Sequence, residues 1–141
     1  MNLRSRCLAP LLAGLLVATS AGAALAQIPL TVADVDGNEV AIEDISNVAT
    51  LGGVFTETVY ALGAQDHIGA IDASSFYPPE ALEEKPNFGY YRFLSAEPVL
   101  AQDPSLIIGN EETGPPEVVQ QLRSAGVPIL LLPDNNDVQA A

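Results

Sequence analysis

Two adjacent tyrosines, an arginine and a glutamate lie within one stretch of nine residues, from Gly89 to Glu97. Adjacent tyrosines in a loop, such as Tyr90 and Tyr91, are usually packing residues whose hydroxyls contact water. A phenol that loses its proton is a hard anionic oxygen ligand, however, and such a ligand suits ferric iron. The guanidinium of Arg92 favours the phenolate because a nearby cation lowers the pKa of a tyrosine. This stretch is therefore the first candidate for ligand chemistry.

The segments on either side indicate how these groups are held. Pro-rich and strand-like segments flank the stretch, so we expect a loop over residues 89–94. Ser95 is typical of a helix N-cap, whose hydroxyl accepts a hydrogen bond from a backbone N–H of the first turn. Glu97 then lies in that turn, where the positive end of the helix dipole favours an anion, and Pro98 is tolerated there. The sequence predicts an aromatic and cationic loop beside a fixed carboxylate.

The first 26 residues have the pattern of a secretory signal peptide. Arg4 and Arg6 precede an apolar core over residues 8–18, and small residues at 24 and 26 form a small-x-small cleavage site. We expect cleavage after residue 26. An uncleaved anchor is the alternative, although the apolar run is short for a membrane span.

The remaining residues, 27–141, are enough for one small domain with a single core. Cys7, the only cysteine, would leave with the signal, so no disulfide is expected. Three basic residues would then stand against eighteen acidic ones, which gives a formal charge of −15. Such a surface repels phosphate backbones and argues against nucleic acid as a partner. It also helps to keep an exported protein in solution.

The first half of this domain predicts a hairpin followed by a strand, a turn and a helix. Residues 31–42 alternate around an Asp-Gly turn pair and indicate a hairpin. A buried strand over 47–51 ends at Gly52-Gly53, and a helix follows over 55–62. The apolar residues at helical spacing on that helix are Phe55, Val59 and Leu62, with Gly63 as the C-cap. The glycine pair is either a tight turn or a cradle for an anion, although it lacks the spacing of the known phosphate-binding loops.

Polar residues follow the second strand, which we expect over residues 68–71. Asp72, Ser74, Ser75 and Tyr77 would lie at the carboxyl end of that strand. This is the edge at which open α/β sheets bind ligands. A short helix over 80–84 should follow.

The second half predicts two further strand and helix units. Residues 98–102 complete the short helix capped at Ser95 and lead to strands over 105–108 and 127–132, with a helix over 117–125 between them. The side chains expected to point inward from that helix are Val118, Leu122 and Ala125. The fold class is thus α/β with a mainly parallel sheet. No helix follows the last strand to cover it, so we expect a chain cut after about one lobe of a larger protein.

The sequence gives no positive support for catalysis. His67 is the only histidine and has no second histidine or cysteine with which to form a chelating set, so we expect a surface position. No serine lies in a recognisable nucleophile elbow.

Four separated motifs resemble one family, in the same order and with the same spacing. They are Leu51–Ala64, Gly69–Pro78, the run Phe88-Gly-Tyr-Tyr-Arg-Phe-Leu-Ser-Ala-Glu97, and Gly114-Pro-Pro116 with Ala125-Gly-Val-Pro128. These residues resemble the amino-terminal lobe of periplasmic haem-binding proteins of ABC-type haemin importers.

The resemblance implies a three-layer, Rossmann-like lobe that is the amino-terminal half of a two-lobed, helix-hinged periplasmic binding protein. Such a protein holds haem between its lobes and delivers it to the permease in the inner membrane. It further implies a binding protein rather than an enzyme, and a monomer that does not span the membrane after signal cleavage.

The resemblance also implies roles for individual residues. Tyr90 matches the tyrosine that ligates the haem iron, and Glu97 matches the carboxylate that docks onto arginines of the permease. Other side chains expected near the haem are Tyr91, Arg92, Tyr77, Ser74 and Ser75. Pro98 departs from the family pattern, which usually has glycine there.

Two other functions stay open on the sequence. The same fold could carry a ferric siderophore or cobalamin, whose binding proteins generally use aromatic or basic pockets without a ligating phenolate. A secreted α/β enzyme, with its catalytic residues outside these 141 residues, is the second alternative. Because a second lobe is missing, we expect these residues alone to retain haem weakly or not at all.

Overall fold

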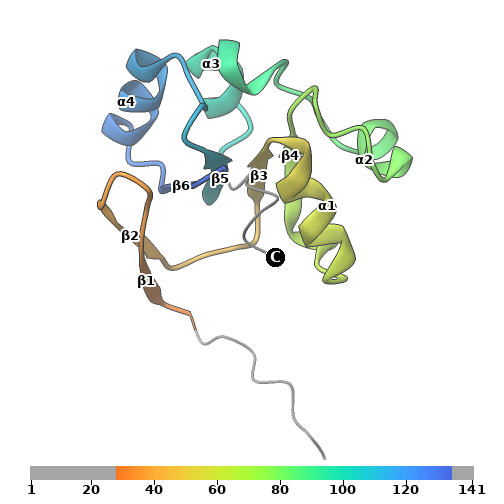
Figure 1. Cartoon of the computed structure of the whole chain (residues 1–141), viewed down its shortest axis with the longest axis horizontal. Coiled ribbons are helices and arrows are strands. Elements are labelled where there is room, and N and C mark those ends of the chain that lie inside the picture. Colours follow the sequence, from red (N-terminus) through yellow and green to blue (C-terminus); the bar gives the residue numbers. More distant parts are fainter. Residues whose placement is uncertain (1–27, 135–141) are drawn as a thin grey trace, which may run out of the picture.

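A computed structural model describes residues 28–134 of the chain (Figure 1). The predicted signal peptide over 1–26 lies outside the described residues. Within 28–134, no helix is both long enough and apolar enough to cross a bilayer.

A four-stranded parallel sheet forms the centre of the lobe, in the order β4-β3-β5-β6. The strands are β3 (Val48–Leu51), β4 (Ile68–Ile71), β5 (Leu106–Asn110) and β6 (Ile129–Leu132). The chain moves outward from β3 to β4 and then returns to the other side of β3 to form β5. The sheet therefore reverses its direction of winding between β3 and β5, which is where open α/β sheets form ligand crevices at their carboxyl edge. The predicted α/β class is confirmed.

Two helices cover one face of the sheet, α3 (Ala96–Leu100) and α4 (Pro116–Ser124). They lie together along the upper side of Figure 1. Val99 and Leu122 are fully buried and pack with Ile107 of β5 in the largest apolar cluster. Two short 3-10 turns, η1 (Gln65–His67) and η2 (Tyr91–Phe93), precede β4 and α3.

Two helices cover one half of the opposite face of the sheet, and the hairpin covers the other half. Helix α1 (Gly53–Ala61) lies over β3 and β4, with α2 (Pro79–Glu84) beside it. The hairpin of β1 (Leu30–Ala33) and β2 (Glu39–Ile42) packs its apolar side chains against β5 and β6. The hairpin thus covers the face of the last strand for which the sequence predicted a missing helix. The premise that the last strand lacks cover was wrong, because the hairpin formed by residues 30–42 packs against it.

The buried carboxylate of Asp34 fixes the hairpin turn. It accepts hydrogen bonds from the backbone N–H of Asp36 at 3.0 Å and of Asn38 at 2.7 Å, and from the Asn38 side chain at 2.9 Å. Arg123 of α4 adds an ion pair at 2.8 Å. Burial alone would raise the pKa of Asp34, but the Asn38 hydrogen bonds and the charge of Arg123 outweigh it and lower the pKa.

Two helix faces differ from the predicted ones. Leu62, one of the three apolar residues at helical spacing, lies just past α1 and is 76% exposed, and the buried side chain of α1 is Thr56. A buried threonine is explained by its hydroxyl contacts with polar groups under the helix, described below. In α4 the buried residues are Val119 and Leu122, and the predicted Val118 is half-buried and packs against the same apolar cluster. The predicted inward Ala125 is an exposed C-cap residue.

Candidate functional site

Residues 88–94, here called the edge segment, cross the carboxyl edge of the sheet from the end of β4 to the loop after β5. Its backbone hydrogen bonds, donor first, are Phe88 to Ile71 (3.1 Å), Ala73 to Gly89 (2.8 Å), Gly114 to Tyr91 (3.0 Å) and Leu94 to Gly114 (2.9 Å). The segment is mostly a loop, as predicted, and contains the 3-10 turn η2. It therefore passes over the point where the sheet reverses its winding.

The carboxylate of Asp72 lies directly under the edge segment and is fully buried. Its Oδ1 accepts from the backbone N–H of Gly52 at 3.0 Å and from the hydroxyls of Ser74 at 3.0 Å and Ser75 at 3.1 Å. Its Oδ2 accepts from the backbone N–H of Ser74 at 3.0 Å and of Tyr91 at 3.4 Å. Five hydrogen bonds compensate the removal of this charge from water.

These contacts decide between the two readings of the Gly52-Gly53 pair. The N–H of Gly52 donates to Asp72, and the N–H of Gly53 donates to the hydroxyl of Ser74 at 3.0 Å. The donors at the start of α1 are thus occupied by groups of the chain itself. A β-carbon at Gly53 would lie 2.5 Å from the backbone oxygen of Ser74, which requires glycine there. The pair forms a tight turn and does not offer a cradle to an external anion.

Ser75 belongs to a buried chain of hydroxyls and not to the surface. Its side chain lies 2.7 Å from the hydroxyl of Thr56, which lies 2.7 Å from that of Thr50. All three residues have no exposed surface. Such a side chain cannot touch a ligand outside the lobe, so the predicted direct contact of Ser75 with a ligand is contradicted. Ser74 is half-buried, and its hydroxyl already bonds to Asp72 and Gly53.

The two tyrosines of the edge segment have different surroundings. Tyr90 is 40% exposed, whereas Tyr91 is 8% exposed. Their rings meet edge to face, with centroids 4.7 Å apart and planes inclined by 60°. The ring of Phe93 lies 6.1 Å from that of Tyr90 and is 77% exposed. Tyr91 therefore supports Tyr90 from below, and Tyr90 presents its phenol to the solvent.

Arg92 is paired within the site. Its Nη2 forms an ion pair with Glu112 in the loop after β5, and its Nε donates to the hydroxyl of Tyr91 at 3.1 Å. The Tyr91 hydroxyl in turn lies 3.4 Å from the carboxylate of Glu112. The guanidinium also lies over the Tyr91 ring, 5.5 Å from its centroid. The cation is thus shared between Tyr91 and Glu112.

This pairing changes the predicted electrostatics of Tyr90. Its pKa is raised above the ordinary 10.0, first by hydrogen bonding to the side chain of Tyr91 and then by partial burial. Arg92 lowers this pKa, as predicted, but the negative charge of Glu112 opposes that effect. The predicted lowering was wrong, because the side chain of Tyr91 and partial burial outweigh the charge of Arg92, which Glu112 also opposes.

Aromatic rings are exposed on two loops of the carboxyl edge. Phe76 and Tyr77, which follow β4, are 73% and 64% exposed. Tyr77 lines a groove of about 450 Å³ beside α1, together with Tyr60 and Pro78. The structure therefore brings together Tyr90, Tyr91 and Arg92 and gives Tyr77 other neighbours.

Glu97 lies in the first turn of α3 and is exposed, which agrees with its predicted placement. Ser95 occupies the N-cap position, but its side chain makes no capping hydrogen bond, so that part of the prediction was wrong. Pro98 is accommodated within α3, whose first turn leaves its missing N–H without consequence. His67 is exposed as expected, with Nδ1 at 2.9 Å from the carbonyl oxygen of Ile45.

Sequence reasoning missed the contacts of two acidic residues of this site. Asp72 was placed correctly at the end of β4, but its hydrogen bonds to three separate segments were not foreseen. Glu112 was given no role from the sequence. Its place in the chain could have marked it, because the loop after β5 lies across the reversal point from the loop after β4.

The site can supply one strong metal ligand and not a complete set. Within 28–134, no group of three or more histidine, cysteine, aspartate or glutamate side chains could hold a metal ion. A single phenolate suits a metal that arrives with its other ligands in place, as iron does in a porphyrin. The exposed phenol of Tyr90, beside the apolar ring of Phe93, fits a flat metal complex of this kind.

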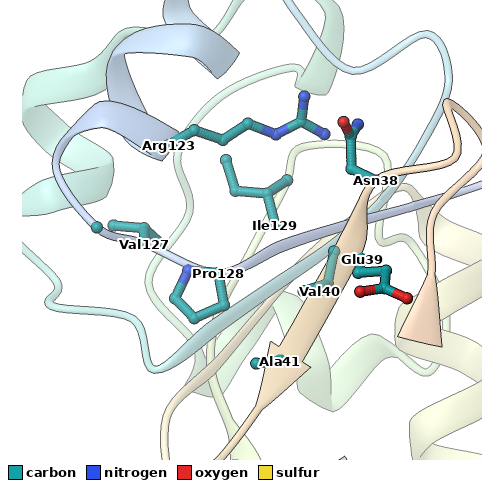
Figure 2. A pocket seen from close by; sticks show the side chains of 9 residues that line it. Asn38, Glu39, Val40, Ala41, Arg123, Val127, Pro128 and Ile129 are labelled. Carbon is teal, nitrogen blue, oxygen red and sulfur yellow. The ribbon is translucent and has the colours of Figure 1, made fainter. Parts of the chain in front are cut away.

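A second hollow, shown in Figure 2, lies between β2 and the residues that lead into β6. It has a volume of about 340 Å³, and Arg123 extends along it toward Asn38. The guanidinium of Arg123 is already paired with the buried Asp34. Ile129 at this hollow begins β6, so the hollow lies at the amino end of that strand, away from the edge segment. It is not the candidate site.

A parallel α/β lobe whose carboxyl edge presents aromatic rings has the architecture of a ligand-binding lobe. Residues 48–140 match the family described as periplasmic binding protein, and the chain belongs to that family.

Solved structures and a curated relative are similar to this chain over part of their length. The periplasmic haem-binding protein RhuT from Roseiflexus sp. RS-1 is 43% identical, with a TM-score of 0.61, over 64% of this chain and 35% of that protein. The haem-binding protein HmuT is 33% identical, with a TM-score of 0.69, over 78% of this chain and 36% of that protein. The vitamin B12-binding protein of Vibrio parahaemolyticus is 34% identical over 64% of this chain and 32% of the relative. The chain thus spans about a third of the length of these proteins.

Proposed function

We propose that residues 27–141 form the amino-terminal lobe of a monomeric periplasmic protein that captures haem and delivers it to an ABC permease. Residues 1–26 would direct export as a cleavable signal peptide. The haem-binding names of the similar solved structures support this cargo. A family of binding proteins supports a transport role rather than an enzymatic one.

The observation that carries the proposal is the position of Tyr90. Its phenol is exposed at the point where the sheet reverses its winding, and Tyr91 and Phe93 flank it. We assign to it the ligation of ferric haem iron. Phe93 and Phe76 would offer apolar contact to the macrocycle, with Tyr77 as a more distant contact.

The raised pKa of Tyr90 gives this ligation a pH dependence. Iron binds the phenolate, so a proton must leave when the complex forms. Below the pKa of Tyr90 the apparent affinity should therefore rise with pH. The chain's own contribution is to hold the phenol in place and to set how readily it loses that proton.

Arg92 and Glu97 take the remaining roles in the proposal. A guanidinium binds carboxylates in a two-pronged geometry, so Arg92 suits the acidic side chains of haem. It could do so only by sharing or releasing Glu112. Glu97 is exposed on the first turn of α3 and would dock onto basic residues of the permease, where such a pair gives orientation more than affinity.

Cobalamin is the second candidate cargo, because a curated relative is a vitamin B12-binding protein. A ferric siderophore remains the third. Neither of these requires a ligating phenolate at position 90.

A titration of the protein from its complete reading frame separates these cargoes. Ferric haem and cyanocobalamin would be added in parallel to the wild type, to Tyr90→Phe and to Tyr60→Phe. Tyr60→Phe is the matched control, since its buried hydroxyl has no hydrogen-bond partner in the described part of the chain. We expect stoichiometric haem binding that only Tyr90→Phe weakens. Tight binding of cyanocobalamin with no binding of haem would overturn the proposal.

A further inference from the structure

We infer that Asp72 is a positioning residue for the Tyr90 phenol, and this inference rests on the proposed role of Tyr90. Its buried carboxylate connects the edge segment to the turn after β3 and to the loop after β4. Asp72 does not face the ligand. It acts on the ligand through the backbone that carries Tyr90.

The two oxygens of this carboxylate have separate tasks. Oδ1 bonds to Gly52 and to the hydroxyls of Ser74 and Ser75, all of which lie beneath the edge segment. Oδ2 bonds to the backbone N–H groups of Ser74 and Tyr91. Oδ2 is therefore the atom through which Asp72 reaches the edge segment.

The contact between Asp72 and Tyr91 is adjacent in the chain to Tyr90, the proposed iron ligand. The backbone of Gly89 is held by Ala73, and the carbonyl of Tyr91 is held by Gly114. The N–H of Tyr91 belongs to the peptide that joins it to Tyr90, so its bond to Asp72 fixes that peptide. At 3.4 Å the bond is long, but its buried position and carboxylate acceptor strengthen it.

The buried position of Tyr91 depends on the same contact. Its ring supports Tyr90 at 4.7 Å and its hydroxyl meets Arg92 at 3.1 Å. If the backbone at Tyr91 moved, the support of Tyr90 and the pairing of Arg92 would change together. Asp72 is thus placed to set both the direction and the surroundings of the phenol.

The variant Asp72→Asn tests the hydrogen bonds that Oδ2 accepts, because it can leave those of Oδ1 in place. The amide oxygen of asparagine can replace Oδ1, and its NH2 group then faces two backbone donors where Oδ2 accepted. Asp34→Asn is the matched control, because Asp34 is also buried and also accepts several hydrogen bonds, but it lies in the hairpin turn. Both variants should lose stability, and only Asp72→Asn should disturb the edge segment.

Amide hydrogen exchange on the ligand-free protein from the complete reading frame gives the first result. In the wild type we expect the Tyr91 amide to exchange at least about 100-fold more slowly than an unprotected amide. In Asp72→Asn, exchange over residues 89–94 should speed up at least about tenfold relative to Asp34→Asn. A freely exchanging Tyr91 amide in the wild type, which needs no variant to fold, would overturn the inference. So would equal exchange in the two variants.

Ferric haem binding gives the second result. We expect Asp72→Asn to weaken it by roughly 10- to 100-fold, as changes to groups that orient a metal ligand commonly do, while Asp34→Asn leaves it unchanged. Equal affinity in both variants would contradict the inference. If the wild type binds no haem, the proposed cargo is lost, and the exchange result alone decides whether Asp72 positions Tyr90.

Discussion

Within residues 28–134, two buried aspartates accept similar sets of hydrogen bonds but have different roles. Asp34 takes its donors from its own turn and from Arg123, so it closes the hairpin onto α4 with a compensating cation. Asp72 takes neutral donors from three separate segments and pairs with no cation in the described part of the chain. Asp34 therefore stabilises a local structure, whereas Asp72 sets how loops meet at the open edge. Burial of a charge alone does not tell a structural role from a positioning one.

Removing the Asp72 carboxylate should have the largest effect on stability. Asp72→Ala leaves five buried or half-buried hydrogen-bond donors without their acceptor. We expect the free energy of unfolding to fall by about 4 kcal/mol, since each buried unpaired group costs about 1–3 kcal/mol and some will find water. Urea unfolding measures this change. A loss below about 1 kcal/mol would mean that the carboxylate does not connect these segments.

Breaking the Asp34 pair should have the next largest effect. Arg123→Ala leaves the fully buried carboxylate of Asp34 without its cation, and the arginine side chain is 28% exposed. We expect a loss of about 2 kcal/mol in unfolding free energy, below the range for a fully buried pair because of that exposure. Haem affinity should stay at the wild-type value. A change in affinity would show that the hairpin and the edge segment are coupled, and the proposed contrast would fail.

Acid titration sharpens the contrast further. The pKa of Asp34 is lowered from 3.8 in the folded protein, so Asp34 contributes stability above about pH 4 and loses it as the pH falls through the folded pKa. Asp34→Asn should therefore lose less stability than the wild type between about pH 6 and pH 3. Thermal unfolding at several pH values measures this. Parallel pH dependence in the two proteins would contradict the assignment.

The smallest expected effect concerns Glu112. Its negative charge raises the pKa of Tyr90 and engages Arg92. Glu112→Gln should lower that pKa. The midpoint of a plot of haem affinity against pH should therefore move to lower pH. Glu111→Gln, on the exposed neighbouring residue, is the control. An upward shift would mean that Glu112 supports the phenolate instead.

Much of the fold was readable from the sequence because local signals agreed with the packing. The Asp36-Gly37 turn, the apolar strands and the glycines after helices predicted the hairpin and the parallel sheet correctly. Inward helix faces were less readable, as Thr56 and Val119 show, since a buried hydroxyl partner and the rotation of a helix on a sheet depend on distant residues.

The sequence predicted the residue types of the candidate site better than the contacts between those residues. The adjacent Tyr90, Tyr91 and Arg92 stand out in one short stretch. The ion pair between Arg92 and Glu112 and the contact of Asp72 with Tyr91 span about 20 residues of sequence, and no local pattern marks them. Those distant pairings place Arg92 beside Tyr91 and Glu112, while the adjacent Tyr91 and partial burial raise the pKa of Tyr90.

The visible absorption spectrum of the ferric haem complex tests the central claim most directly. The protein from the complete reading frame and its Tyr90→Phe variant would be compared at one pH and one haem concentration. We predict a high-spin spectrum of the phenolate-ligated type in the wild type and its loss in Tyr90→Phe. The same spectrum in both proteins would contradict the assignment of Tyr90 as the iron ligand.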